Sequence, residues 1–329
     1  MTTAIGKGNK MRKWMGILSA VLALSTGVAG EIKVKGYAFG DYYYVASGTN
    51  KEQNGFQIRR IYLTADKPFN ERFSSRVRLE ANDAGFGANA KMTTAIKDAY
   101  LKYKKDGRSV VIGLSPTPTW SLTEKIWGYR SIEKTIIDLN KVGSSRDLGI
   151  LAETRLDADG KASVQVMFGN GNSNKSEVDN GKKAYLRLDL RPTSAFGASI
   201  YADYESRPAD QDRTSLGGLL YTSSKGRAFG LEGIWQNRKN AVAGADIAVR
   251  GLSLFGRAKV DDRYGFFGRV DYYDPNDSTG DDAVTRMFAG VDITPHEDVH
   301  IMPNVIVESY QDSAVDTVLI PRVTVYFIF

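Results

Sequence analysis

Val323-Thr-Val-Tyr-Phe-Ile-Phe329 ends the chain with a strict alternation of side chains. In an extended strand the two faces carry, respectively, Val323, Val325, Phe327 and Phe329, and Arg322, Thr324 and Tyr326. A soluble protein would present that apolar face as an open edge that invites aggregation. A barrel closed within a lipid bilayer has no edge, an apolar outer face and a wet inner face. The segment therefore predicts a transmembrane β-barrel.

The N-terminus has the layout of a secretory signal peptide. A basic region precedes a short apolar core at residues 14–24, and small residues follow at 25–30. The apolar core is too short to span a bilayer as a helix. We expect residues 1–29 to be removed, with cleavage after Ala29 or after Gly30; a retained N-terminal anchor is the alternative. The basic region consists of Lys7, Lys10, Arg12 and Lys13.

Composition narrows the class of protein. The leader carries four of the basic residues and no acidic ones, so its removal lowers the formal net charge from +6 to +2, and no nucleic-acid partner is indicated. The chain has no cysteine, which excludes a disulfide framework. No other stretch is long and apolar enough for a helical span. The 17 Tyr and 14 Phe residues suit a barrel with aromatic girdles, although composition alone also allows a soluble all-β protein.

Alternating segments recur along the chain, and short connections alternate with long ones. Outer-membrane barrels show this pattern, with tight periplasmic turns and longer extracellular loops. Both termini of such barrels lie in the periplasm, so the strand count must be even. Residues 237–251 decide the count: as a strand they give seventeen, and as an outer loop they give sixteen. We expect one antiparallel, all-β barrel of sixteen strands over residues 30–329, with 237–251 as a loop.

The connection at residues 116–145 is far longer than ordinary loops, which indicates a function. Ser121 and Glu124 have capping-box spacing, so a short helix is expected to start there. We interpret this segment as a third extracellular loop that folds inward and narrows the pore. The alternative places it outside, as a lid or a subunit contact. Its candidate constriction residues are Arg130, Glu133, Lys134 and Asp138.

The polar faces of the strands are densely charged. A charged side chain on the lipid face costs about 2–4 kcal/mol near the midplane, so these faces must meet water. The predicted pore-lining residues on the strands are Arg60, Arg76, Arg78, Glu80, Lys102, Lys104, Arg155, Arg187, Asp189, Arg191, Arg257, Arg269 and Arg322. The same faces carry Lys259 and the acidic residues Asp66, Asp98, Glu153, Asp203, Glu205, Asp271, Asp292 and Glu308.

A wet, charged interior enclosed by sixteen strands is wide enough to be an aqueous channel. Its charges are nearly balanced and slightly basic, which favours a mildly anion-selective or nearly non-selective pore. The alternative is that these charges only solvate the wall and pair across strands.

Catalytic and metal sites are not indicated. His296 and His300 are the only histidines, and they flank a turn instead of sharing a helix face. No serine lies in a recognisable nucleophile elbow with a histidine in reach. The acidic loop at residues 274–282 lacks the terminal glutamate of a calcium loop. We therefore expect no cofactor, no bound metal and no enzymatic activity.

Several motifs resemble bacterial porins of the phosphate-selective porin O/P family. They are Phe56-Gln-Ile-Arg-Arg-Ile-Tyr-Leu63, Asp98-Ala-Tyr-Leu-Lys-Tyr103, Ile112-Gly-Leu-Ser-Pro-Thr-Pro118, Ser144-Ser-Arg-Asp-Leu-Gly-Ile150 and the terminal Phe329. The resemblance implies a sixteen-stranded barrel, usually trimeric, whose long third loop corresponds to residues 116–145. It also implies that the barrel-assembly machinery reads the C-terminal strand, here through Phe327 and Phe329. Acidic residues alternate with the basic ones inside, so phosphate selectivity is not carried over.

The sequence thus predicts a porin of the bacterial outer membrane for passive diffusion of small hydrophilic solutes and ions. The alternatives are a channel specific for phosphate, other anions or sugars, and a non-channel barrel that acts as an enzyme or an adhesin. Trp120, Trp127 and Tyr129 are the candidates for a sugar slide. The expected partners are outer-membrane lipid and lipopolysaccharide, the assembly machinery, permeating solutes and two further copies in a homotrimer.

Overall fold

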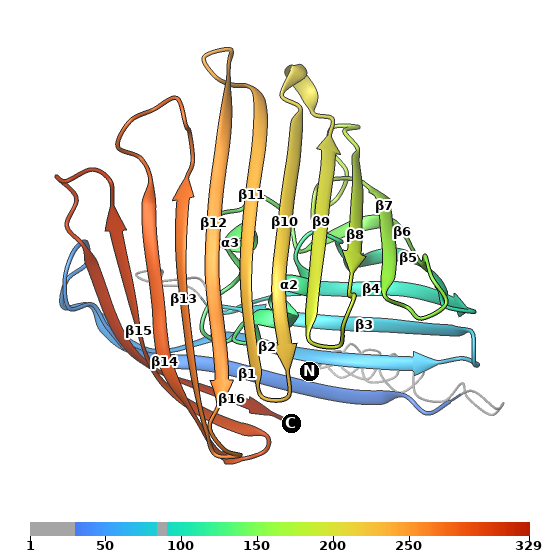
Figure 1. Ribbon diagram of the computed structural model, residues 1–329, viewed down its shortest axis with the longest axis horizontal. Coiled ribbons are helices and arrows are strands. Elements are labelled where there is room, and N and C mark those ends of the chain that lie inside the picture. The colour runs from blue at the N-terminus through green and yellow to red at the C-terminus, as the bar shows by residue number, and fades with distance from the viewer. Residues whose placement is uncertain (1–29, 84–90) are drawn as a thin grey trace, which may run out of the picture.

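The computed structural model describes residues 30–83 and 91–329, and it forms a closed antiparallel barrel in which β1 pairs with β16 (Figure 1). The sixteen-strand prediction is confirmed. The signal-peptide prediction for residues 1–29 lies outside the described residues. The strands are β1 Lys33–Tyr44, β2 Asn54–Pro68, β3 Phe73–Asn82, β4 Thr93–Lys105, β5 Arg108–Pro116, β6 Arg146–Arg155, β7 Ala162–Gly169, β8 Lys183–Leu190, β9 Phe196–Glu205, β10 Arg213–Ser224, β11 Arg227–Val242, β12 Ala245–Lys259, β13 Tyr264–Asp274, β14 Val284–His296, β15 Val299–Tyr310 and β16 Val318–Ile328.

The C-terminal strand closes the barrel. Its register with β1 runs from Tyr37 opposite Ile328 to Tyr43 opposite Arg322. Beyond the last strand residue, Gly36 and Phe329 exchange backbone hydrogen bonds of 2.7 and 2.9 Å. Closure therefore leaves neither terminal strand with an open edge.

The two faces of the wall have opposite chemistry, as the alternation predicts. Phe56, Ile200 and Leu254 point outward and expose 87, 61 and 60% of their surfaces. Inward residues such as Thr324 and Asp271 are fully buried. Such an apolar outer surface suits lipid contact and would be unfavourable in water.

The two ends of the barrel differ. Turns of a few residues, such as 106–107 and 225–226, lie at the end that also holds the start of β1 and the end of β16. We call this the short-turn end. The other end carries longer segments, including 45–53, 170–182 and 275–283, and we call it the long-loop end.

The prediction that residues 237–251 form an outer loop is wrong. β11 and β12 continue through this segment and meet at a turn of Ala243 and Gly244, which have φ values of 49° and 84°. Arg238 still pairs with Ile247. These strand ends carry a polar run at 237–240, so the alternation that identifies lipid-exposed strands is lost there. The count of sixteen holds because one turn joins two long strands.

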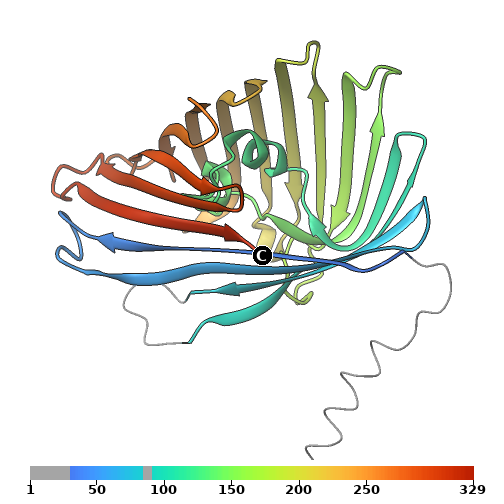
Figure 2. The same ribbon diagram turned by 90° about the horizontal axis from the view of Figure 1, so that it is seen from below.

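Two short helices occupy the long connection, α2 Ser121–Trp127 and α3 Ile136–Leu139, and a 3-10 turn, η1 Pro208–Asp210, lies in a separate loop. Figure 2 shows α2 and α3 within the ring of strands. The helix at Ser121 forms as predicted, but not through a capping box. Trp120 is the N-cap residue and no side chain caps the helix. In the described residues, no helix is long and apolar enough to cross a membrane.

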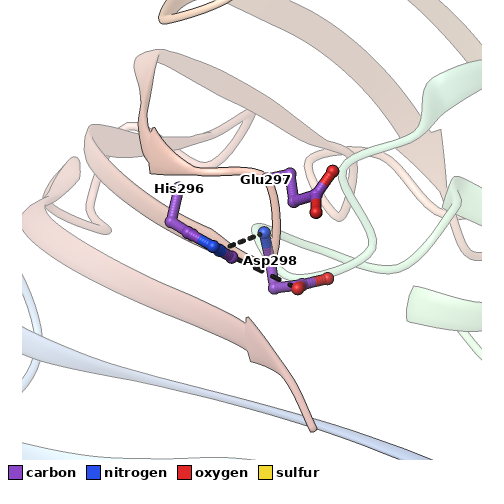
Figure 3. Close-up of side chains that lie close together, drawn as sticks. All are labelled: His296, Glu297 and Asp298. Atoms are coloured by element: carbon purple, nitrogen blue, oxygen red, sulfur yellow. Dashed lines mark hydrogen bonds and ion pairs between the residues drawn. The ribbon is translucent and has the colours of Figure 1, made fainter.

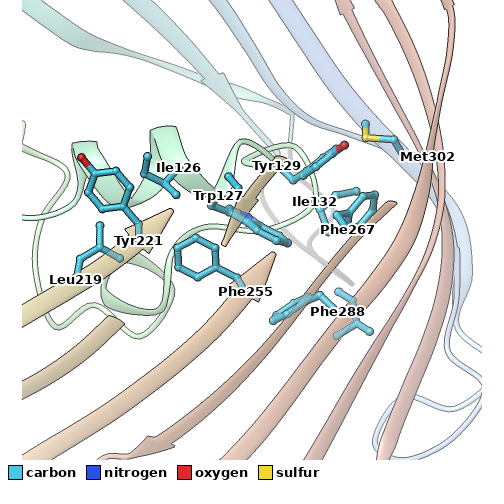
Figure 4. Close-up of a cluster of buried hydrophobic side chains, with 12 residues drawn as sticks. Ile126, Trp127, Tyr129, Ile132, Leu219, Tyr221, Phe255, Phe267, Phe288 and Met302 are labelled. Carbon is cyan, nitrogen blue, oxygen red and sulfur yellow. The ribbon is translucent and has the colours of Figure 1, made fainter. Parts of the chain in front are cut away.

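The connection packs against the inner wall through two apolar clusters. In the first (Figure 4), Trp127 is 1% exposed and its ring centroid lies 5.8 Å from that of Phe255. In the second, Ile136 and Ile137 pack with Tyr201 and Val249. Burial of this apolar surface holds the connection inside the barrel.

Trp120, Trp127 and Tyr129, the candidates for a sugar slide, are all buried, and Trp127 and Tyr129 belong to the first apolar cluster. The Trp127 ring packs within the first apolar cluster, whereas Tyr129 also borders one lumen cavity and Trp120 another.

Candidate functional site

The lumen has two unlike sides. We call the inward faces of β7 to β15 the anchor wall, because both apolar clusters of the connection rest on them. We call the inward faces of β2 to β4 the open wall. The candidate site is the space between the connection and the open wall.

Arginines predicted to line the pore bind the backbone of the connection. Each donates a hydrogen bond to one of its carbonyl oxygens. The bonds are Arg187 to Pro118 at 2.7 Å, Arg257 to Ile126 at 3.0 Å, Arg269 to Lys134 at 2.5 Å and Arg322 to Ile132 at 3.0 Å. Irregular backbone inside a barrel needs such partners, and guanidinium offers five donors.

Neighbouring carboxylates neutralise two of these anchors closely. Arg269 lies 2.5 Å from Asp271, and Arg187 lies 2.9 Å from the predicted lining residue Asp189. Arg187, Arg269 and Arg322 are buried, so they stabilise the connection where the sequence suggested contact with permeating solutes.

The open wall carries a ladder of ion pairs that remains accessible. Arg76 pairs with Asp66 at 2.6 Å, and Arg60 lies 3.1 Å from Glu80. Arg78 donates to Thr64 at 2.8 Å and lies 3.6 Å from Asp98. The Arg76 and Arg60 side chains keep 25 and 21% of their surfaces exposed, so a solute can contact them.

Two β-bulges add cations that strict alternation hides. The β1–β2 register skips Arg59, and the β3–β4 register skips Lys97. Lys97 thereby reaches the lumen and lies 3.0 Å from Glu80. Arg59 lies beside Asp41 and donates to the carbonyls of Ser131 and Ile132. A period of two cannot reveal an inserted residue, and no turn signal marks either bulge.

Other predicted lining residues lie towards the short-turn end. Lys104 and Arg155 are exposed near the ends of β4 and β6. Lys102, two residues before Lys104 on the same face of β4, is half-buried. Arg191 follows β8 and donates to Ser194 O at 2.8 Å. These residues belong to the rim, not to the middle of the lumen.

The connection and the open wall approach each other at a narrow gap. A cavity of only about 30 Å³ lies there, between Tyr37 of β1 and Lys97 of the open wall on one side and Glu124, Arg130 and Asp138 of the connection on the other. Larger cavities adjoin it. An outer cavity of about 420 Å³ and a side cavity of about 370 Å³ open towards the long-loop end, and an inner chamber of about 420 Å³ lies towards the short-turn end.

Arg130 lines all four cavities, which places it at their junction. Its guanidinium lies 3.5 Å from Glu124 and 5.8 Å from the centre of the Phe39 ring. Lys134 lines the outer and side cavities, Asp138 the outer cavity and the gap, and Glu133 the side cavity. All four predicted constriction residues therefore border open space.

The charges of the connection respond to this setting. Burial raises the pKa of Glu124, and nearby Arg130 only partly offsets the effect. Burial also disfavours the charged form of Glu133, but Arg59, Arg322, Arg130 and the hydrogen bond from Lys134 N–H together outweigh burial and lower the pKa of that carboxyl. Glu133 thus stays ionised, whereas Glu124 takes up a proton more readily than an ordinary glutamate.

The outer cavity is strongly basic, with nine cationic and three acidic lining side chains. The acids are Glu80, Asp138 and Glu205. The cations are Arg60, Lys97, Arg130, Lys134, Lys141, Lys175, Lys183, Arg207 and Arg213. Six of these cations were not predicted, because they lie at a bulge, in loops or at strand ends. Of the six, only Lys183 could have been predicted from the alternation of side chains, because it lies on the same face of β8 as Arg187.

The two histidines lie in different surroundings. His296, Glu297 and Asp298 share the turn between β14 and β15, with ligand atoms within 4.8 Å of one another (Figure 3). Their side chains are exposed, and Asp298 N–H donates to His296 Nδ1 at 3.2 Å. His296 and Asp298 thus contact each other within the turn. His300 points into the inner chamber, where its Nδ1 lies 2.8 Å from Asp292.

Phe327 and Phe329, the predicted assembly signal, both lie on the outer face. They are 42 and 59% exposed, and their ring centroids lie 6.0 Å apart. They are accessible to lipid or to another protein.

The chain matches one described family. The sequence profile of phosphate-selective porin O and P matches residues 32–264. A search of curated protein sequences gives no match.

Several solved structures share the fold. The anion-selective porin from Comamonas acidovorans has a TM-score of 0.73 at 13% identity, covering 91% of this chain and 99% of that one. The outer membrane channel DcaP of Acinetobacter baumannii has a TM-score of 0.64 at 14% identity, covering 93 and 99%. The trimer form of the outer membrane protein OmpT of Vibrio cholerae has a TM-score of 0.64 at 11% identity, covering 92 and 100%. At such identities these likenesses show the fold alone.

Proposed function

Because the chain belongs to the phosphate-selective porin O and P family, we propose that its lumen passes small anions in preference to cations. The protein is an outer-membrane porin, and its closed barrel is a channel for passive diffusion. Family and fold are those of a channel and not of an enzyme. The observation that carries the anion preference is the outer cavity, with its nine cations and three acids.

Fixed charge of one sign concentrates mobile ions of the other. The Debye length is about 8 Å at physiological ionic strength, comparable to the dimensions of such a cavity. An anion entering from the long-loop end therefore meets a positive potential before it reaches the narrow gap. Lys141 and Lys175 form no ion pair with any described residue, which leaves their charge available.

The connection at residues 117–145 is the proposed constriction, with Arg130, Glu133, Lys134 and Asp138 as the residues that meet the solute. The support is the position of Arg130 at the junction of the cavities and the small volume of the gap beside it. Arg60, Arg78 and Glu80 are the proposed lining residues on the facing wall.

The test is the zero-current potential of the purified porin in a planar bilayer under a gradient of potassium chloride. We expect the sign that chloride permeation gives. A potential of the opposite sign would overturn the anion preference while leaving the porin assignment intact.

The finer alternative is a channel specific for one anion. It would show a current that saturates as that solute is raised, whereas general diffusion gives a current that stays ohmic. Titration of the conductance with phosphate, beside chloride at matched ionic strength, separates the two.

The partners are also proposed. Phe327 and Phe329 are accessible on the outer face, which suits recognition of the last strand by the barrel-assembly machinery. A homotrimer in contact with outer-membrane lipid and lipopolysaccharide is the proposed assembly, supported by the described trimer of one similar structure. Deletion of Phe329 should lower the amount of heat-modifiable barrel recovered from outer membranes, and an unchanged yield would contradict the role in assembly.

A further inference from the structure

The inner chamber combines aromatic rings with cations from separate strands. Tyr37 and Tyr326 come from the neighbouring strands β1 and β16, and Arg257 and Lys259 come from β12. The chamber encloses about 420 Å³, within the range of pockets that hold small organic ligands. It lies on the short-turn side of the narrow gap.

The two tyrosines keep part of their ring surface accessible, although Tyr37 also packs on Tyr62 at 4.6 Å and Tyr326 on His300 at 5.5 Å between centroids. Their centroids lie 5.7 Å apart at an interplanar angle of 44°, and both residues are only half-buried. Neither hydroxyl makes a hydrogen bond with any described residue. A further planar ring can pack on this pair in the offset geometry that aromatic groups prefer.

The uncommitted charge in the chamber is positive. Its two carboxylates are engaged, Glu124 with Arg130 at 3.5 Å, and Asp292 with His300 at 2.8 Å and Tyr129 at 3.1 Å. Arg257 and Lys259 form no ion pair with the described residues.

The arginine is also oriented. Arg257 Nε donates to Ile126 O at 3.0 Å, and its guanidinium passes over Gly128, the residue with φ of 77° that ends α2. Its terminal amines form no hydrogen bond with the described chain, so they are free to bind a planar anion in bidentate fashion.

We propose that the inner chamber is a binding site for small aromatic carboxylates, with the ring against Tyr37 and Tyr326 and the carboxylate on Arg257 and Lys259. Inorganic anions and aliphatic acids can bind only to the two cations, and neutral aromatic compounds can pack only on the two tyrosine rings. This inference rests on the proposed anion-conducting function, because the ligand reaches the chamber as a permeating anion. A bound ligand obstructs the lumen next to the gap.

The test is block of the potassium chloride current by benzoate, with acetate and benzamide as matched solutes. Two added aromatic contacts correspond to roughly tenfold tighter binding, so benzoate should half-block at about one tenth of the acetate concentration. Benzamide should block no better than acetate. Equal block by benzoate and acetate would overturn the proposal.

Variants locate the site. The double variant Tyr37→Leu, Tyr326→Leu should lose most of the benzoate advantage, and Lys259→Gln should weaken benzoate and acetate alike. Tyr100→Leu, which changes a half-buried tyrosine of β4 outside the chamber, should block as the native protein does. A double variant that keeps the full benzoate advantage would contradict the assignment.

The zero-current potential, measured in the same membranes without organic solute, tests the anion preference separately from the binding site for aromatic carboxylates. A chloride-selective channel without preferential benzoate block refutes this site alone. Calorimetric titration of the detergent-solubilised barrel with benzoate and acetate compares the two affinities without a current. If benzoate binds more tightly but the zero-current potential shows a cation-selective channel, the anion preference alone is refuted.

Discussion

Arg269 on the anchor wall and Arg76 on the open wall each form an arginine–aspartate ion pair, but the two arginines have different surroundings. Each lies against an aspartate, at 2.5 and 2.6 Å respectively. The Arg269 side chain is 1% exposed, and its guanidinium lies 5.4 Å from the centre of the Trp127 ring. The Arg76 side chain is 25% exposed. Whether an inward arginine holds backbone or meets ions depends on whether the connection covers it.

This difference separates two properties of the channel. Changes on the anchor wall should alter how firmly the connection is seated and hence the width of the gap. Changes in the outer cavity and on the open wall should alter which ions pass, with the width preserved.

The largest effect is expected from Trp127→Ala, which empties the centre of the first apolar cluster. Removing a buried tryptophan costs about 3–5 kcal/mol, so the variant should be less stable to denaturant in detergent and its single-channel current should be noisier. The control is Trp235→Ala, because Trp235 faces outward and is 37% exposed. Equal current noise in the two variants would show that the connection is not held by this cluster.

A smaller effect is expected from the double variant Lys141→Glu, Lys175→Glu in the outer cavity. The excess of lining cations over acids falls from six to two, so the anion-to-cation permeability ratio should drop by roughly half. Conductance should change little, because the gap is untouched. Lys105→Glu, Lys225→Glu makes the same charge change on exposed residues at the short-turn end and should leave the ratio near its native value.

The smallest effect is expected from pH. Because burial raises the pKa of Glu124, acidification should neutralise this carboxyl before ordinary glutamates. The gap then loses a negative charge, so the zero-current potential should move further in the anion direction as pH falls into the window just above the ordinary glutamate range. In Glu124→Gln that early step should be missing. Superimposable pH curves for the two proteins would contradict this role for Glu124.

The sequence predicts the barrel well because lipid imposes a simple rule on the outer face. Alternation such as that from Val323 to Phe329 locates strands wherever they cross the apolar layer. Alternation is lost where the strands extend beyond the apolar layer, and residues 237–251 were therefore predicted to be a loop. It also fails at bulges, which hid Arg59 and Lys97.

The candidate site was harder to predict, because an inward arginine looks the same in sequence whether it faces water or a carbonyl oxygen. Arg187, Arg257, Arg269 and Arg322 carry no local mark of the backbone that covers them. Their role depends on the path of residues 117–145, set by tertiary packing of Trp127 and Ile136. The constriction residues could be proposed from the sequence because an insert that mixes apolar and charged side chains needs both a surface to pack on and contact with water.

The most direct test of the account is the single-channel conductance of a variant that lacks residues 120–140. Its folding is checked by heat-modifiable migration in detergent. Removal of the connection should open the lumen, so the conductance should rise by roughly twofold or more and larger solutes should pass. Unchanged conductance and unchanged solute exclusion in a folded barrel would contradict the central claim that this segment, seated on the anchor wall, narrows the channel.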